Sequence, residues 1–280
     1  MKTVFLLIMV LVAGDHSNVM GDHVKHSKKT PHTTTQIIQQ KGYRAETHTV
    51  ITEDGYILTL DRISANKEGI SGKQPVFLLH GVFDTSYVWI NNINTSLAFL
   101  LSDENFDVWM GNSRGNPYSN THLKYSPLSP QYWNFSFHEM GVYDLPACID
   151  YILNVTNASD TIYYVGHSQG GSVFYVYAST FPEMAVKKFK IAVTLAPAVF
   201  LGHANELTRL SSTLLTGNKW LLNPSRVTHI NLSNMYQFVT RDCDDSPLAT
   251  PFCKTLIEVN AGFDGMSFNH CLGTHLSMFR

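Results

Sequence analysis

The most informative absences in this 280-residue sequence concern charge and long apolar runs. Only 15% of the residues are charged, and 20 lysines and arginines nearly balance 22 aspartates and glutamates, so no basic excess points to nucleic acid. No uninterrupted apolar run reaches the roughly 20 residues of a membrane-spanning helix, so we expect no transmembrane anchor. The 44% of hydrophobic residues predict instead a folded domain with a sizeable core.

Cysteine is also scarce, with four residues in the whole chain. None stands in a Cys-x-x-Cys pair, so zinc-finger and thioredoxin-like sites are unsupported, and we expect no metal centre. Cys243 and Cys253 enclose a short loop that a disulfide could close easily, although nothing requires all four cysteines to pair. Cys148 lies in an apolar helical stretch and is expected to be a buried thiol, whereas the state of Cys271 stays open.

The N-terminus has the pattern of a secretory signal. Lys2 precedes an apolar run from Val4 to Ala13, which is too short to span a bilayer, and small residues follow, so residues 1–14 are interpreted as a signal peptide. Residues 15–33 are polar and rich in histidine, and we interpret them as a flexible lead or pro-segment rather than a metal site. We therefore expect a secreted or lysosomal protein. Five Asn-x-Ser/Thr sequons fit this route, at Asn94, Asn134, Asn154, Asn157 and Asn231.

Beyond residue 34 the apolar pattern alternates between strands and helices. A short helix near residues 35–42 precedes two alternating stretches joined by Glu53-Asp54-Gly55, which is typical of a β-hairpin. Short apolar runs separated by helical periods then predict an α/β fold, a mostly parallel sheet with helices on both faces. The predicted strands are 47–51, 56–63, 76–79, 107–110, 162–165 and 191–195, and the helices are 96–102, 138–153 and 172–180.

The pattern Gly-x-Ser-x-Gly occurs twice, and its context separates the two matches. A nucleophile elbow places its serine on a sharp turn between a strand and a helix. Ser113 follows a predicted strand, but the polar and proline-containing residues 116–120 after it cannot begin a helix. Ser168 follows the predicted strand 162–165 and precedes a credible helix. We therefore predict Ser168 as a nucleophile and assign Ser113 to a structural loop.

Acyl transfer also requires donors for the oxyanion that forms during attack. The residue after the nucleophile normally supplies one backbone N–H, which here is that of Gln169. The loop after the strand 76–79 supplies the second, and Val82 is the predicted donor because Gly81 lets the backbone turn before it. His80 is interpreted as a hydrogen-bonded structural residue below the site.

Five segments of the sequence carry a family resemblance, Leu79–Val82, Asp107–Asn116, His138–Met140, Tyr143–Pro146 and Gly166–Gly170. Together they resemble the acid lipase family, which includes gastric lipase and lysosomal acid lipase. The resemblance covers about residues 33–270 and implies an α/β-hydrolase fold with a helical cap that acts on triacylglycerols and cholesteryl esters at a lipid–water interface. It implies Ser168 as the nucleophile, Val82 and Gln169 as the oxyanion donors, no cofactor, and Cys243–Cys253 as a disulfide.

No triad acid or histidine is identified in this chain. In this fold they follow the serine on separate loops, and Asp264 with His270 or His275 stands too close in sequence for the intervening crossover. By resemblance, both residues belong to a C-terminal segment beyond this chain. We therefore expect a core at residues 34–199 without its last strands and an incomplete cap at 200–280. The function is then that of a neutral-lipid lipase or, alternatively, of a catalytically silent lipid-binding relative; a purely structural role is a weaker third hypothesis.

Overall fold

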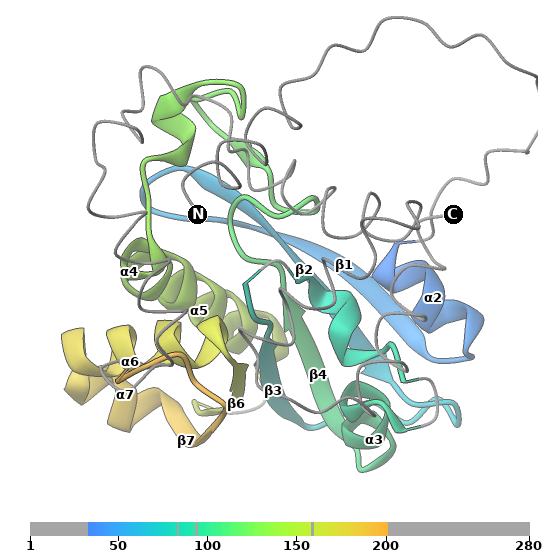
Figure 1. Ribbon diagram of the computed structural model, residues 1–280. Helices are drawn as coiled ribbons and strands as arrows, with labels where there is room; N and C mark the ends of the chain where they lie inside the picture. The colour runs from blue at the N-terminus through green and yellow to red at the C-terminus, as the bar shows by residue number, and fades with distance from the viewer. Residues whose placement is uncertain (1–32, 83, 93–94, 158–159, 201–280) are drawn as a thin grey trace, which may run out of the picture. The chain divides into compact units, whose positions relative to one another are not determined.

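The computed structural model describes residues 33–200, except residues 83, 93, 94, 158 and 159. These residues form a seven-stranded sheet in the order β1-β2-β4-β3-β6-β7, with β5 paired to β2 outside this path (Figure 1). The strands are β1 (Arg44–Ile51), β2 (Tyr56–Ala65), β3 (Gln74–Leu79), β4 (Phe106–Gly111), β5 (Thr121–His122), β6 (Ile162–His167) and β7 (Phe189–Leu195). The helices are α2 (Thr34–Gln40), α3 (Leu97–Asp103), α4 (Phe137–Glu139), α5 (Leu145–Thr156), α6 (Gln169–Thr180) and α7 (Pro182–Lys188).

The sheet combines a parallel half with an antiparallel half. Strands β4, β3, β6 and β7 are parallel neighbours, and β1, β2 and β4 pair antiparallel. The turn of the β1–β2 hairpin contains Gly55, whose φ of 95° lies in the left-handed region that glycine adopts without steric cost. The predicted hairpin and the four predicted strands that follow it are therefore confirmed, each with bounds slightly wider than the sequence indicated.

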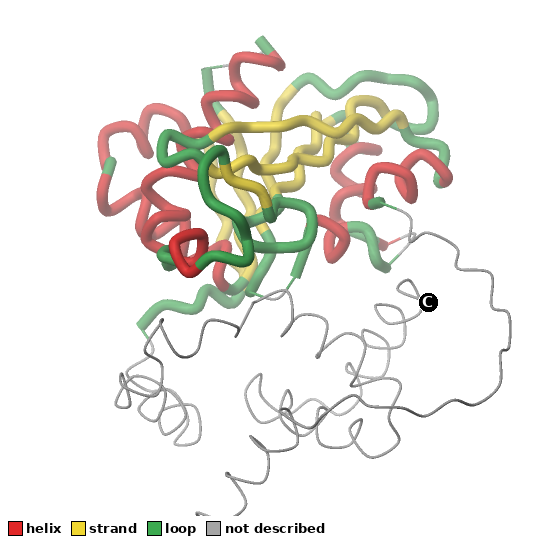
Figure 2. Tube along the Cα trace, turned by 90° about the horizontal axis from the view of Figure 1, so that it is seen from above, coloured by secondary structure: helices red, strands yellow, loops and turns green. Residues whose placement is uncertain are grey.

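Helices cover both faces of the sheet, as predicted (Figure 2). Alternate residues of a strand point to opposite faces, so apolar strands pack against helices on each of them. Phe77 and Leu79 of β3 pack into a cluster that contains buried residues of α5 and α6. Val76 and Leu78 of the same strand pack into a second cluster with buried residues of α2 and α3. Since β3 is apolar on both faces, it occupies the centre of the fold.

The predicted helix 138–153 is present but is divided by a wider turn. Ser136 and Glu139 form a capping box that starts α4, one residue before the predicted beginning. A π-helical turn from Met140 to Asp144 then leads into α5, ahead of Pro146, which has no N–H for the helical ladder. Within this turn a Cβ on Gly141 would lie 2.5 Å from Val176 Cγ1, so the glycine permits close packing on α6.

Helix α7 and strand β5 were not predicted, because both lack the periodic apolar pattern from which the other elements were predicted. Helix α7 contains no buried residue, so its sequence shows no apolar face with helical spacing. Strand β5 has only two residues, which is too short for an alternating pattern.

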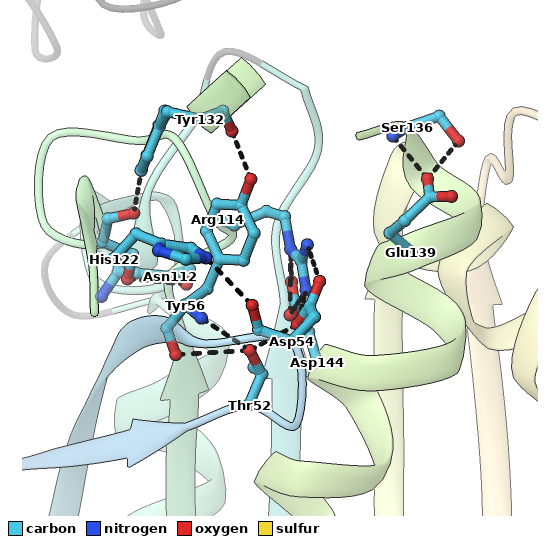
Figure 3. A network of polar contacts seen from close by, with 11 residues as sticks. Thr52, Asp54, Tyr56, Asn112, Arg114, His122, Tyr132, Ser136, Glu139 and Asp144 are labelled. Atoms are coloured by element: carbon cyan, nitrogen blue, oxygen red, sulfur yellow. Dashed lines mark hydrogen bonds and ion pairs between the residues drawn. The ribbon is translucent and has the colours of Figure 1, made fainter. Parts of the chain in front are cut away.

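A buried arginine joins three loops at one end of the sheet (Figure 3). The side chain of Arg114, in the loop after β4, is fully buried and donates from Nε to both carboxylate oxygens of Asp144 at 3.0 Å. Its Nη1 donates to Oδ2 of Asp54, in the hairpin turn, at 2.7 Å. The guanidinium carbon also lies 3.9 Å from the centroid of the Tyr56 ring. One side chain therefore links the hairpin, the β4 loop and the start of α5.

Replacing this arginine should strongly destabilise the protein. In Arg114→Met the carboxylates of Asp54 and Asp144 would lose their cation, and breaking a buried ion pair in this way costs about 3–5 kcal/mol. The free energy of unfolding, measured by urea denaturation, should fall by that amount. As a matched control, Arg44→Met removes an exposed arginine that lies 3.9 Å from Glu46 and should change stability by less than about 1 kcal/mol. Equal losses in the two variants would contradict this account.

Candidate active site

Three parallel strands end at the same level and bring their following loops together. Leu79 of β3 pairs with Gly111 of β4 on one side and with Gly166 of β6 on the other. The loop after β3 contains His80 to Val82, and the loop after β4 contains residues 112–120. Strand β6 is followed by the turn at Ser168. In α/β folds the carboxyl ends of parallel strands are where ligands bind. This edge of the sheet is therefore the candidate site.

Ser168 occupies the turn between β6 and α6 in a strained backbone conformation. Its φ is 50° and its ψ is −113°, a combination that residues with a side chain rarely adopt. The turn is held by two backbone hydrogen bonds, from Ser168 N–H to the Leu195 carbonyl at 2.9 Å and from Ala198 N–H to the Ser168 carbonyl at 3.2 Å. Strand, sharp turn and helix thus follow one another here as the sequence predicted.

Glycines make this turn sterically feasible. A Cβ added to Gly166 would lie 2.6 Å from the carbonyl carbon of Gly170, and one on Gly170 would lie 2.3 Å from the carbonyl oxygen of Leu79. Both separations are shorter than any real contact of a Cβ atom. The glycines on either side of Ser168 therefore allow α6 to pack directly against β6 and β3.

The loop after β3 passes close to the serine. A Cβ on Gly81 would lie 3.2 Å from Ser168 Cβ, so the two backbones are neighbours. Val82 and Gln169, the predicted oxyanion donors, both line one pocket at this edge, together with Met140 and Pro117. The arrangement brings these two residues to the same pocket.

His80 is buried below this loop and has both ring nitrogens engaged. Ser113 N–H donates to His80 Nε2 at 3.1 Å, and His80 Nδ1 donates to the Gly81 carbonyl at 2.6 Å. Burial lowers the pKa of His80 to about 4, although the bond to Gly81 opposes this shift. Its two nitrogens are thus occupied, and His80 is not available to accept a proton from Ser168. These contacts fit its interpretation as a structural residue, and those of Ser113 fit a loop.

Asp84 also lines this pocket, although its sequence context did not mark it as a site residue. Thr85 N–H donates to Asp84 Oδ1 at 2.9 Å, and burial raises the pKa of the carboxyl to about 7. A carboxyl group in an apolar wall is therefore neutral in acid and charged above neutral pH. A single aspartate in a loop has no sequence signal that would have marked it.

The other predicted residues fall partly within the described chain. The acceptor residues of three sequons, Asn134, Asn154 and Asn157, are exposed. Cys148 is a buried free thiol, which confirms that expectation. The remaining predicted residues, Asn94, Asn231, Cys243, Cys253 and Cys271, the acids and histidines considered for the triad, and the segments 1–32 and 201–280, lie outside the described residues.

The described residues show neither a metal cluster nor a membrane-spanning helix. No cluster of three or more histidines, cysteines, aspartates or glutamates is placed to hold a metal ion in this part of the chain. None of the helices described here combines the length and apolar character that crossing a bilayer requires.

Comparison with known proteins agrees with this geometry. The profile of the alpha/beta hydrolase fold matches residues 74–234, and that of a partial alpha/beta-hydrolase lipase region matches residues 34–93. Human lipase member K is 40% identical over 84% of this chain and 59% of its own length. Mouse gastric triacylglycerol lipase is 37% identical over 95% of this chain and 68% of its own length. The lysosomal acid lipase/cholesteryl ester hydrolase of Macaca fascicularis is 42% identical over 71% of this chain and 51% of its own length.

The fold and the site define an α/β hydrolase, since the profile for that fold covers more than half of the chain. Within that class the chain belongs to the acid lipase family, because a gastric lipase matches it at 37% identity over 68% of the lipase. The family predicted from the sequence is thereby confirmed, and its members are lipases. The chain spans between about half and two thirds of the length of these relatives, with coverages of 51%, 59% and 68%.

The packing at Ser168 predicts the effect of one added methyl group. Gly170 lies in the first turn of α6, where helix propensity alone would favour alanine by up to about 1 kcal/mol. Because the new Cβ would collide with the Leu79 carbonyl oxygen, Gly170→Ala should instead destabilise the protein by at least about 2 kcal/mol. The control Gly69→Ala has open space around its Cβ and should cost only about 1 kcal/mol for its φ of 77°. A Gly170→Ala variant as stable as the parent in urea denaturation would refute this packing.

Proposed function

We propose that this protein hydrolyses carboxylic esters of neutral lipids, with Ser168 as the nucleophile. The observation that carries the proposal is the backbone of Ser168, held at a φ of 50° on the turn between β6 and α6 and next to Gly81. Strain of this kind persists only where the surrounding structure enforces it, and it is typical of a nucleophile elbow. The family membership supports the same reaction class.

In the proposed reaction, Ser168 Oγ attacks the ester carbonyl carbon, and its proton passes to a triad histidine, a role assigned to no residue of this chain. The negative charge that develops on the carbonyl oxygen would be stabilised by the N–H groups of Val82 and Gln169. The alcohol leaves as the acyl-enzyme forms, and water then releases the fatty acid. The N-terminus of α6 adds a favourable dipole at the oxyanion. All of these steps use protein groups and water, and none requires a cofactor.

Triacylglycerols and cholesteryl esters are the proposed substrates. Two of the relatives carry these substrates in their names, a gastric triacylglycerol lipase and a lysosomal acid lipase/cholesteryl ester hydrolase. The pocket beside Ser168 contributes apolar side chains from Val82, Met140 and Pro117, which suit an acyl chain. The protein would then act at a lipid–water interface in lipid degradation, with residues 200–280 as the proposed cap.

We also propose that the protein follows the secretory route, to the lysosome or out of the cell. The apolar run in residues 1–14, the exposed sequons and the gastric and lysosomal relatives support this. Protein recovered from mammalian cells should lack the signal segment and lose mass on treatment with peptide N-glycosidase. A peptide map without reduction should join Cys243 to Cys253. An intact mass that still begins at Met1 and carries no glycan would contradict the proposal.

The two serines of the duplicated motif give the direct test of the nucleophile. In protein that also carries a triad acid and histidine, Ser168→Ala should abolish hydrolysis of a short p-nitrophenyl ester and of a triacylglycerol emulsion, because the acyl-enzyme forms on the Ser168 hydroxyl. Ser113→Ala keeps the backbone N–H that donates to His80 Nε2, so the kcat of this variant should stay within about threefold of the parent. Both variants should unfold at the parent's temperature.

The outcomes separate the proposal from its alternative. A well-folded Ser113→Ala protein that loses kcat as completely as Ser168→Ala would show that the wrong serine had been chosen. A parent protein that binds triacylglycerol emulsion but hydrolyses neither substrate would favour the alternative, a lipid-binding relative without turnover.

A further inference from the structure

The first Gly-x-Ser-x-Gly motif, residues 111–115, contains no elbow, yet the loop that it begins lies against the oxyanion loop. Ser113 N–H and Asn116 make hydrogen bonds to His80, which precedes Gly81, and Asn112 accepts one from Ser86 N–H, further along the same loop. A backbone N–H group acts only as a donor, so the oxygen of an asparagine side chain must face it and the amino group must lie on the other side. The direction of every hydrogen bond in the network follows from them.

Asn116 presents its amino group to His80. Its Oδ1 accepts from the N–H groups of Tyr118 at 3.0 Å and Ser119 at 2.9 Å, which leaves Nδ2 on the opposite side. Nδ2 then donates to His80 Nε2 at 3.2 Å and to Asn112 Oδ1 at 3.1 Å. The side chain therefore closes its own loop and holds the imidazole at the same time.

Asn112 anchors this network in the core. Its Oδ1 accepts from Ser86 N–H at 2.9 Å, so its Nδ2 is the group that donates to Asp61 Oδ2 at 3.2 Å. The Asp61 carboxylate is buried and also accepts from Ser86 Oγ at 2.7 Å and Thr35 Oγ1 at 2.6 Å. The network thus extends from a fixed carboxylate to the histidine below the site.

The network leaves His80 one protonation state. Two donors, Ser113 N–H and Asn116 Nδ2, converge on Nε2, so this nitrogen carries no proton. The proton therefore sits on Nδ1, which donates to the Gly81 carbonyl at 2.6 Å. A carbonyl and the N–H that follows it belong to one planar trans peptide and point in opposite directions. Because the Gly81 carbonyl points at His80, the Val82 N–H points away from His80.

We propose that His80 and Asn116 are positioning residues that orient the Gly81–Val82 peptide, so that the Val82 N–H donates to the oxyanion formed at Ser168. This inference rests on the proposed function and adds a role for the first motif, which supports the donor instead of supplying a nucleophile. Gly81 itself has no side chain to hold this peptide, and its neighbour Val82 is 45% exposed. The orientation therefore depends on His80.

Asn116→Asp is the sharpest variant, because the new carboxylate can still accept from Tyr118 and Ser119 N–H but cannot donate to His80. A carboxylate oxygen would face Nε2 and favour a proton there. Nδ1 could then serve as an acceptor and release the Gly81 carbonyl. In protein that also carries a triad acid and histidine, the variant should react with a fluorophosphonate about 10–100-fold more slowly at saturation, since one oxyanion donor is misplaced, with little change in the half-saturating concentration. Asn120→Asp makes the same charge change on an exposed residue of this loop and should react at the parent's rate.

The tautomer of His80 is measured separately, by ¹⁵N NMR of the full-length parent labelled on histidine. We expect one neutral imidazole with its proton on Nδ1 throughout pH 5–8, and its signal should move in Asn116→Asp. A proton on Nε2, or titration of that ring near its ordinary pKa, overturns the inference even if the variant does not fold. A parent that reacts at Ser168 while Asn116→Asp reacts equally fast also overturns it and leaves the proposed function standing. A parent that carries a triad acid and histidine and still does not react at Ser168 overturns both.

Discussion

The left-handed backbone of Ser168 is the constraint on which the rest of the site depends. A residue with a side chain holds this conformation only if its neighbours leave no alternative. Here α6 packs so closely on β3 that the Leu79 carbonyl would lie 2.3 Å from any Cβ on Gly170. The same packing places Gly81 beside Ser168 and sets Val82 and Gln169 in the wall of one pocket. The geometry proposed for the reaction is thus a consequence of how closely a helix and a strand approach each other.

Two buried polar networks hold the loops around this contact, one around a buried charge and the other around a neutral imidazole. Arg114 carries a charge into the interior, where its two carboxylate partners and the Tyr56 ring compensate for lost hydration (Figure 3). Its role is to join segments distant in sequence. The network that ends at His80 contains a neutral imidazole whose single proton has a determined position. A network of that kind sets a direction as well as a position, which an oxyanion donor requires.

Much of the fold could be predicted because the central parallel strands are short apolar runs, buried on both faces in β3, and each main helix has an apolar stripe. The exposed helix α7 has no such stripe, and the π turn before Pro146 depends on contact between Gly141 and α6 that no local pattern encodes. Ser168 could be distinguished from Ser113 because the chemistry needs a helix after the serine. The roles of Asn112 and Asn116 could not be foreseen, since they depend on partners tens of residues away, such as His80, 36 residues from Asn116.

The most direct test of the central claim is a crystal structure of the full-length protein after reaction with a phosphonate ester that mimics the tetrahedral intermediate. The account predicts a covalent bond from phosphorus to Ser168 Oγ and a phosphoryl oxygen about 2.7–3.1 Å from the backbone nitrogens of Val82 and Gln169. The Gly81 carbonyl oxygen should still accept a hydrogen bond from His80 Nδ1. An adduct on another residue, or a phosphoryl oxygen that points away from both amides, would contradict the account.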